Sequence, residues 1–407
     1  MQSDDVWSSA LITWLTEKTL AGVSETDIVG GFCQRLALAG VPVARAVVLV
    51  DTLHPIYEGR AFRWNAGTDQ AEMLEYGRTR EGEPAAAWQR TPLYHLVETN
   101  QTVLRRRLTD PIPADGTPDF ATFAELRNEG MTDYLALVTR LAATGAIGEM
   151  DAIYSVWTSK AADGFSAADI DSLQRLVSPL AAALKCRSLA RIAATLVETY
   201  LGRDAGRRVL SGRIERGIAE RINAVLWFSD LRGFTRITDT AAPDQIIPLL
   251  NDYAEVVISA IHAAGGDVLK LIGDGTLAIF HGDDIGVASH AALGAALAVR
   301  QGIAALNVRR SKADLPVTEV YLGLHVGEVF YGNIGSLERL DFTVVGPAVN
   351  EVNRIAAMCR TVERDALLSA ALVAAARPED RRRLVSVGRY ALRGIAKAQE
   401  LYAPEED

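Results

Sequence analysis

The chain has 407 residues, enough for two or three domains at roughly 100–200 residues per domain. Hydrophobic residues make up 49% and charged residues 23%, ordinary values for a packed globular protein, so disorder over most of the chain is excluded. The net charge of -9 disfavours nucleic acid as a partner, because binding it requires a basic face that displaces counterions from phosphates.

Targeting and cysteine patterns point to the cytoplasm. The longest uncharged apolar stretch, residues 287–299, is well short of the roughly 18–20 residues that span a bilayer, so no membrane insertion is expected. The opening MQSDDVW carries acidic residues where a secretory signal places basic ones. The three cysteines are far apart and form no CxxC pair, which argues against a zinc site and a disulfide framework (Cys33, Cys186 and Cys359).

Residues 1–185 read as helices packed on one sheet. Ser24 followed by Asp27, and Ser166 followed by Asp169, are typical of capping boxes that open helices. We expect helices at 4–20 and 25–39 and from Ser166 onward, and strands at 44–50, 59–64, 133–141 and 150–159.

The closing pattern of this half, a strand followed by a helix capped at Gly164-Phe165-Ser166, resembles the end of a GAF domain, a small ligand-sensing α+β module. A GAF-like sensor domain is therefore expected over 1–185, with a related sensor fold or an unrelated α+β domain as alternatives. Isolated histidines are more often satisfied polar groups than ligands, so we predict no haem or flavin here, although three residues could suit one (His54, Trp88 and His95).

A helical connector is predicted over residues 186–221. Upstream of it, the apolar spacing of Leu173, Leu176, Leu180 and Ala183 suits a seam between two helices, and Pro179 predicts a bend. Residues 202–221 carry six arginines and three acidic residues. This segment is either a solvated link or an element that couples the two halves.

Two aspartates follow strand-like runs in the second half of the chain. The apolar run at 222–229 delivers Asp230, and a long helix at 243–264 leads to GGDVLKLIGDGTLAIF, a hairpin with Asp274 at its turn. Carboxylates are the hard oxygen ligands that Mg²⁺ or Mn²⁺ prefers. We therefore expect both residues at neighbouring strand ends, as a metal site.

A third motif, LDFTVVGPAVNEVNRI, reads as a strand at 342–345 followed by a helix with Pro347 in its first position. Asn350 and Arg354 are then four residues apart and project from one helix face. An amide beside a guanidinium suits negative charge that develops on a phosphoryl group.

The order and spacing of FSDLRGFT, KLIGDG and FTVVGPAVNEVNR resemble the catalytic domain of class III nucleotidyl cyclases over residues 220–403. The resemblance implies metal binding by Asp230, the Leu231 carbonyl and Asp274, with two Mg²⁺ or Mn²⁺ ions per site. By the same resemblance Lys270 and Thr343 read the base, as in a Thr-bearing bacterial subclass, and Asn350 and Arg354 act on the ribose and the transition state.

Two places depart from the pattern that the resemblance implies: Glu328, and the pair Pro347 and Ala348, which replaces more polar residues common in that turn. Glu328 follows GLHVG where some family members have an arginine that binds the triphosphate. Arg393, in ALRGIAKAQELY, is therefore our candidate for holding the phosphates.

The resemblance further implies a ferredoxin-like βαββαβ domain at 222–407 and a homodimer with two sites at the interface. Each site would take its metal carboxylates from one subunit and its base-reading and transition-state residues from the other. The expected reaction converts ATP to 3′,5′-cyclic AMP and pyrophosphate. Guanylate cyclase is an alternative, but guanine typically requires Glu in place of Lys270. Diguanylate cyclase is suggested by Gly265-Gly266-Asp267, although Val268-Leu269 lacks the Glu-Phe of that signature. A catalytically silent nucleotide-binding or dimerisation module is the alternative from another class.

Overall fold

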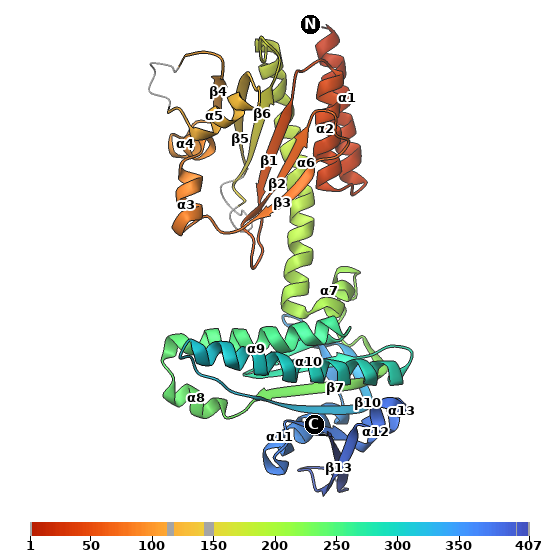
Figure 1. The fold of residues 1–407 in the computed structure, drawn as a ribbon. Helices are drawn as coiled ribbons and strands as arrows, with labels where there is room; N and C mark the ends of the chain where they lie inside the picture. The colour runs from red at the N-terminus through yellow and green to blue at the C-terminus, as the bar shows by residue number, and fades with distance from the viewer. Residues whose placement is uncertain (1, 112–117, 142–149, 396, 406–407) are drawn as a thin grey trace. The chain divides into compact units, whose positions relative to one another are not determined.

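The computed structural model describes residues 2–111, 118–141, 150–395 and 397–405, with side chains from residue 6 onward (Figure 1). The chain divides into two compact units, residues 1–196 and 197–407. Each unit has its own sheet and its own core.

The first unit is a six-stranded antiparallel sheet in the order β3-β2-β1-β6-β5-β4. One face packs on α1, α2 and α6 through residues such as Phe32, Val48 and Leu180, and the other packs on α4 and α5. The elements are α1 (Gln2–Leu20), α2 (Glu25–Leu38), β1 (Arg45–Asp51), β2 (Gly59–Asn65), β3 (Glu72–Tyr76), α3 (Gly82–Gln89), α4 (Pro92–Glu98), β4 (Val103–Arg107), α5 (Ala121–Asn128), β5 (Asp133–Arg140), β6 (Ala152–Ser159) and α6 (Ala167–Leu201).

The expected α+β class is confirmed for this unit, whereas the GAF assignment stays a prediction. Both capping boxes form: the Ser24 hydroxyl accepts from the Asp27 amide, and the Ser166 hydroxyl from the Asp169 amide. The predicted seam is wrong, because its four apolar residues are buried in the core of the unit itself (Leu173, Leu176, Leu180 and Ala183). Their spacing marks an apolar face correctly, but the sheet covers it. The helix also continues through Pro179.

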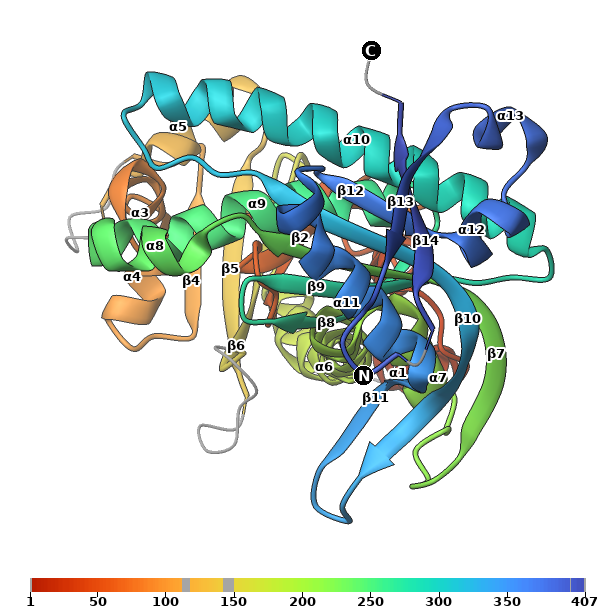
Figure 2. The same cartoon turned by 90° about the horizontal axis from the view of Figure 1, so that it is seen from below.

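The second unit is built on a sheet in the order β13-β14-β12-β10-β7-β9-β8, with β11 paired to β10 (Figure 2). Its central part, β10-β7-β9-β8, is antiparallel and follows the predicted ferredoxin-like βαββαβ order, which confirms that fold. The elements are α7 (Arg203–Leu210), β7 (Ala219–Leu231), α8 (Phe234–Thr240), α9 (Pro243–Ala263), β8 (Asp267–Ile272), β9 (Gly275–Phe280), α10 (Ile285–Lys312), β10 (Val320–Gly335), β11 (Leu340–Val345), α11 (Pro347–Val362), β12 (Ala366–Ser369), α12 (Ala370–Ala375), α13 (Pro378–Arg381), β13 (Leu384–Tyr390) and β14 (Gln399–Pro404).

The central strand β7 has both faces covered. Val225 and Trp227 pack with α9 and α10, while Leu226 and Phe228 pack on the opposite side with α7 and α11. A strand buried on both faces has a continuous apolar run instead of an alternating one, as residues 224–228 do. This burial fixes the strand that ends in Asp230.

The helices α9 and α10 are long and apolar enough, by length and composition alone, to cross a membrane. Each buries residues against the sheet, for example Tyr253 and Val257 of α9 and Ala292 of α10. Core helices meet the same length and composition criteria, so the expectation of no membrane insertion stays a prediction.

The buried ion pair between Glu25 of α2 and Arg60 of β2 provides a test of the first unit. Their side chains are each 4% exposed and 2.9 Å apart, and Ser188 of α6 also donates to Glu25. Replacing Glu25 with Ala should lower the free energy of unfolding by about 3–5 kcal/mol, because the buried Arg60 loses its ion-pair partner. Urea unfolding measures this loss.

The matched control is Glu83→Ala, which removes an exposed ion pair with Arg90. That change should cost no more than about 1 kcal/mol. Equal losses for the two variants would contradict the view that the buried pair stabilises the unit.

Candidate active site

Two aspartates face each other at one end of the second sheet. Asp230 is the penultimate residue of β7, and Asp274 lies in the tight turn between β8 and β9. The pairing of Ser229 with Thr276 places the two strand ends side by side. Burial and the neighbouring carboxyl group of Asp274 together raise the pKa of Asp230 to about 6.

A pocket of about 180 Å³ lies beside the two carboxylates. Leu231 lines it together with Asp230 and Asp274, and the α9 residues Leu250 and Val257 form part of its apolar wall. Two partly buried carboxylates that lie close together repel each other once both are ionised. A divalent cation would remove that repulsion, so this donor set fits Mg²⁺ or Mn²⁺.

The two predicted base-reading residues lie on neighbouring strands. Lys270 is on β8 and Thr343 is on β11, which contacts β8. The ammonium of Lys270 forms an ion pair with Asp341, two residues before Thr343 on β11. The sequence analysis missed Asp341, although its spacing from Thr343 in a strand places both on one face.

The two predicted transition-state residues lie on α11. This helix begins at Pro347, as predicted, and buries Ala348, Val352 and Ile355. Asn350 and Arg354 are exposed on its surface, and within the described parts of the chain neither lines the pocket beside the aspartates. One chain thus presents its metal-type ligands and its α11 polar pair at different places.

The departure at Glu328 and the candidate phosphate-binding residue Arg393 are also at the surface. Glu328 of β10 forms an ion pair with Arg221 of β7, so it neutralises an arginine instead of supplying one. Arg393 is exposed in the segment between β13 and β14. Its proposed role remains a prediction.

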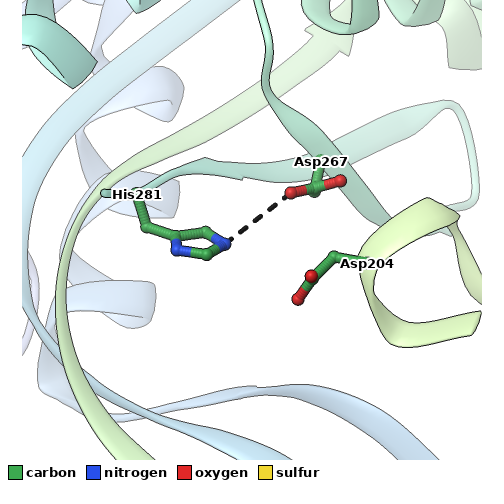
Figure 3. Close-up of side chains that lie close together, drawn as sticks. All are labelled: Asp204, Asp267 and His281. Atoms are coloured by element: carbon green, nitrogen blue, oxygen red, sulfur yellow. Dashed lines mark ion pairs between the residues drawn. The ribbon is translucent and has the colours of Figure 1, made fainter. Parts of the chain in front are cut away.

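A second cluster of titratable groups lies beside α7, shown in Figure 3. Asp204 of α7, Asp267 of β8 and His281 after β9 have ligand atoms within 4.8 Å of one another. Asp204 is already engaged, since Arg208 donates to it at 2.6 Å and Tyr331 at 3.0 Å. The cluster therefore anchors α7 on the sheet, and the sequence analysis missed it because its members come from three elements.

Comparison with known proteins identifies the second unit. The family model described as "Adenylate and Guanylate cyclase catalytic domain" matches residues 219–403. This part of the chain is a cyclase catalytic domain of that family. The finding confirms the resemblance drawn from the three sequence motifs.

Individual relatives of the cyclase domain are similar at modest identity. An adenylate cyclase of Anabaena cylindrica is 34% identical over 164 residues, covering 39% of this chain and 32% of that protein. An uncharacterized protein of Mycobacterium tuberculosis is 30% identical over 242 residues, covering 59% and 42%. The chain thus spans less than half the length of these relatives.

Among solved structures, the adenylyl cyclase CyaB of P. aeruginosa is 21% identical. The similarity covers 47% of this chain and 97% of that one, with a TM-score of 0.43.

The Asp267–His281 pair predicts a pH dependence of the cyclase domain's stability. The carboxylate of Asp267, 3.7 Å from Nε2, raises the pKa of His281, with Asp204 adding to the effect and burial and Arg208 opposing it. A raised folded-state pKa means that the stabilisation is complete below the unfolded value of about 6.5 and is lost as pH rises through the folded value. His281→Gln should therefore lower the melting temperature more at about pH 6 than at pH 8.5.

The expected difference is a few degrees at most, since a partly exposed pair contributes up to about 1 kcal/mol. Differential scanning fluorimetry of both proteins across this range measures it. A destabilisation by His281→Gln that is constant with pH would show that protonation of this histidine has no part in anchoring the cluster.

Proposed function

We propose that the protein is an adenylate cyclase that converts ATP to 3′,5′-cyclic AMP and pyrophosphate. The observation that supports this most is the pair of half-buried carboxylates, Asp230 and Asp274, that line one pocket at the sheet end of a cyclase domain. The adenylate cyclase of Anabaena cylindrica supports the choice of ATP, as do Lys270 and Thr343.

In this reaction the ribose 3′-oxygen attacks the α-phosphorus, and the bond to the β-phosphate breaks as pyrophosphate leaves. Asp230, Asp274 and the Leu231 carbonyl would hold two Mg²⁺ or Mn²⁺ ions, which supply positive charge and a lower pKa for the attacking hydroxyl. That hydroxyl's proton passes to solvent or to a substrate phosphate.

The remaining residues bind and orient ATP. Asn350 would orient the ribose, and Arg354 would neutralise negative charge that develops on the α-phosphoryl group. Lys270 and Thr343 would bind the adenine edge, and Arg393 would bind the polyphosphate. All of these side chains are at least partly exposed, so a substrate can reach them.

We further propose a homodimer with sites shared between subunits. The support is the separation of the carboxylate pocket from Asn350 and Arg354 within one chain, together with exposed apolar residues on and near the β10–β11 hairpin. Phe330, Leu337 and Val345 are 55%, 88% and 48% exposed there. A second copy would cover such a surface at the same time as it completes the site.

Cytoplasmic location, the absence of membrane insertion and regulation by residues 1–185 complete the proposal. The acidic composition and the core positions of α9 and α10 support the first two. Regulation is supported by the continuity of the chain. Helix α6 begins in the first unit and ends at Leu201, with one residue between it and α7 of the second unit.

The shared-site proposal is tested by complementation. Asp274→Asn and Arg354→Ala should each reduce turnover by ~10²–10³-fold, because each removes a dominant electrostatic contribution. Mixing the two inactive proteins should restore about a quarter of wild-type activity, since half of the dimers are mixed and each has one intact site of two.

Cyclic AMP formation from ATP with Mn²⁺ measures the recovery. Asp230→Asn mixed with Asp274→Asn is the control and should stay inactive, because each of the two sites in a mixed dimer then has one damaged set of metal ligands. Mixed dimers that form without regaining activity would contradict sites shared in this way.

Regulation through α6 is tested by changing the helical phase at the division between Leu196 and Val197. One inserted residue rotates the downstream part of the helix by about 100°, whereas seven inserted residues nearly restore the phase. We expect the first insertion to change specific activity several-fold and the second to return it toward the wild-type value. Equal activities in all three proteins would mean that α6 is only a tether.

A further inference from the structure

Asp341 of β11 forms an ion pair with Lys270 of β8, which is 71 residues earlier in the sequence. The side chain of Lys270 is 42% exposed and that of Asp341 is 40% exposed. Neither carries out a structural task in the core, and both remain accessible to a ligand. Asp341 lies two residues before Thr343 on β11.

The alternation of β11 places Asp341 and Thr343 on the same face. Phe342 and Val344 are 5% and 4% exposed and belong to the core below, whereas Asp341 and Thr343 are only partly buried. In the pairing with β10, Asp341 lies opposite Ile334 and Thr343 opposite Gly332. Lys270, Asp341 and Thr343 therefore form one polar group above an apolar layer.

An ammonium beside a carboxylate offers a donor next to an acceptor. The Watson–Crick edge of adenine has the complementary order, with the N1 acceptor next to the 6-amino donor, whereas guanine has an N1–H donor next to the O6 acceptor. With Lys270 opposite N1, the neighbouring carboxylate would accept from the adenine amino group and would repel the guanine O6.

We propose that Asp341 is a specificity-determining residue of the cyclase: it holds Lys270 and accepts a hydrogen bond from the 6-amino group of the base. This deepens the proposed function, on which it rests for the placement of the base at Lys270. A site built to pair with a base edge rejects the wrong base because its polar groups then lose their partners.

A surface ion pair without a role in recognition is the competing explanation. Such a pair contributes little to stability and would affect all nucleotides equally. The test therefore compares three substrates in the full-length protein: ATP, GTP and the triphosphate of purine riboside, which has N1 but lacks the 6-amino group.

Asp341→Ala should lower kcat/KM for ATP at least tenfold relative to both GTP and the purine riboside nucleotide, because alanine has no acceptor for the 6-amino group. The control is Glu338→Ala, which makes the same change of charge on the same hairpin and should leave all three ratios unchanged. Ratios that stay within twofold of wild type in Asp341→Ala, or equal losses for all three substrates, would overturn the proposal.

A binding measurement separates failure of this inference from failure of the proposed function. Competition of the same three nucleotides against a fluorescent ATP analogue gives the binding ratios without turnover. If the protein forms no cyclic nucleotide but Asp341→Ala still loses its binding preference for ATP, the cyclase activity is wrong and the role of Asp341 stands. If turnover is present and neither set of ratios moves, only the role of Asp341 is wrong.

Discussion

The site depends on holding two like-charged carboxylates together at the edge of a buried strand. Asp230 follows a run of β7 residues buried on both faces, and the pairing of β7 with β9 brings the Asp274 turn alongside it. Packing in two cores fixes this register, so neither aspartate can move away without a loss of buried apolar area. The electrostatic cost appears in the raised pKa of Asp230. A bound cation would stabilise the two ionised carboxylates, and this stabilisation would contribute to the affinity of the site for the cation.

Features that depend on neighbouring residues could be predicted from the sequence. The capping boxes at Ser24 and Ser166, the turn at Asp274 and the helix start at Pro347 all form, since each depends on only a few residues. Recognition of three motifs was enough to identify the cyclase domain and its strand order.

Features that depend on what lies across from a residue could not be predicted. The apolar face beginning at Leu173 was recognised, but periodicity does not say whether a sheet or another helix covers it. The contact of Lys270 with Asp341 can be predicted only if β8 and β11 are known to be neighbours. The roles of the site residues likewise depend on which strands lie side by side. Pair contacts between distant strands are the part of a site that sequence patterns specify least.

The β8–β9 hairpin places two chemical tasks within four residues. Lys270 on β8 would contact the base, and Asp274 in the turn would hold metal ions, yet in a shared-site dimer these belong to different active sites. The hairpin begins at Asp267, whose cluster with Asp204 and His281 anchors α7, the helix that comes after α6 across Gly202. Gly202 has a φ of 86°, and an added Cβ would collide with the carbonyl of Val268 on β8, so only glycine allows this close approach. A displacement of α7 would therefore reach the hairpin directly, and through it the base contact of one site and the metal ligands of the other.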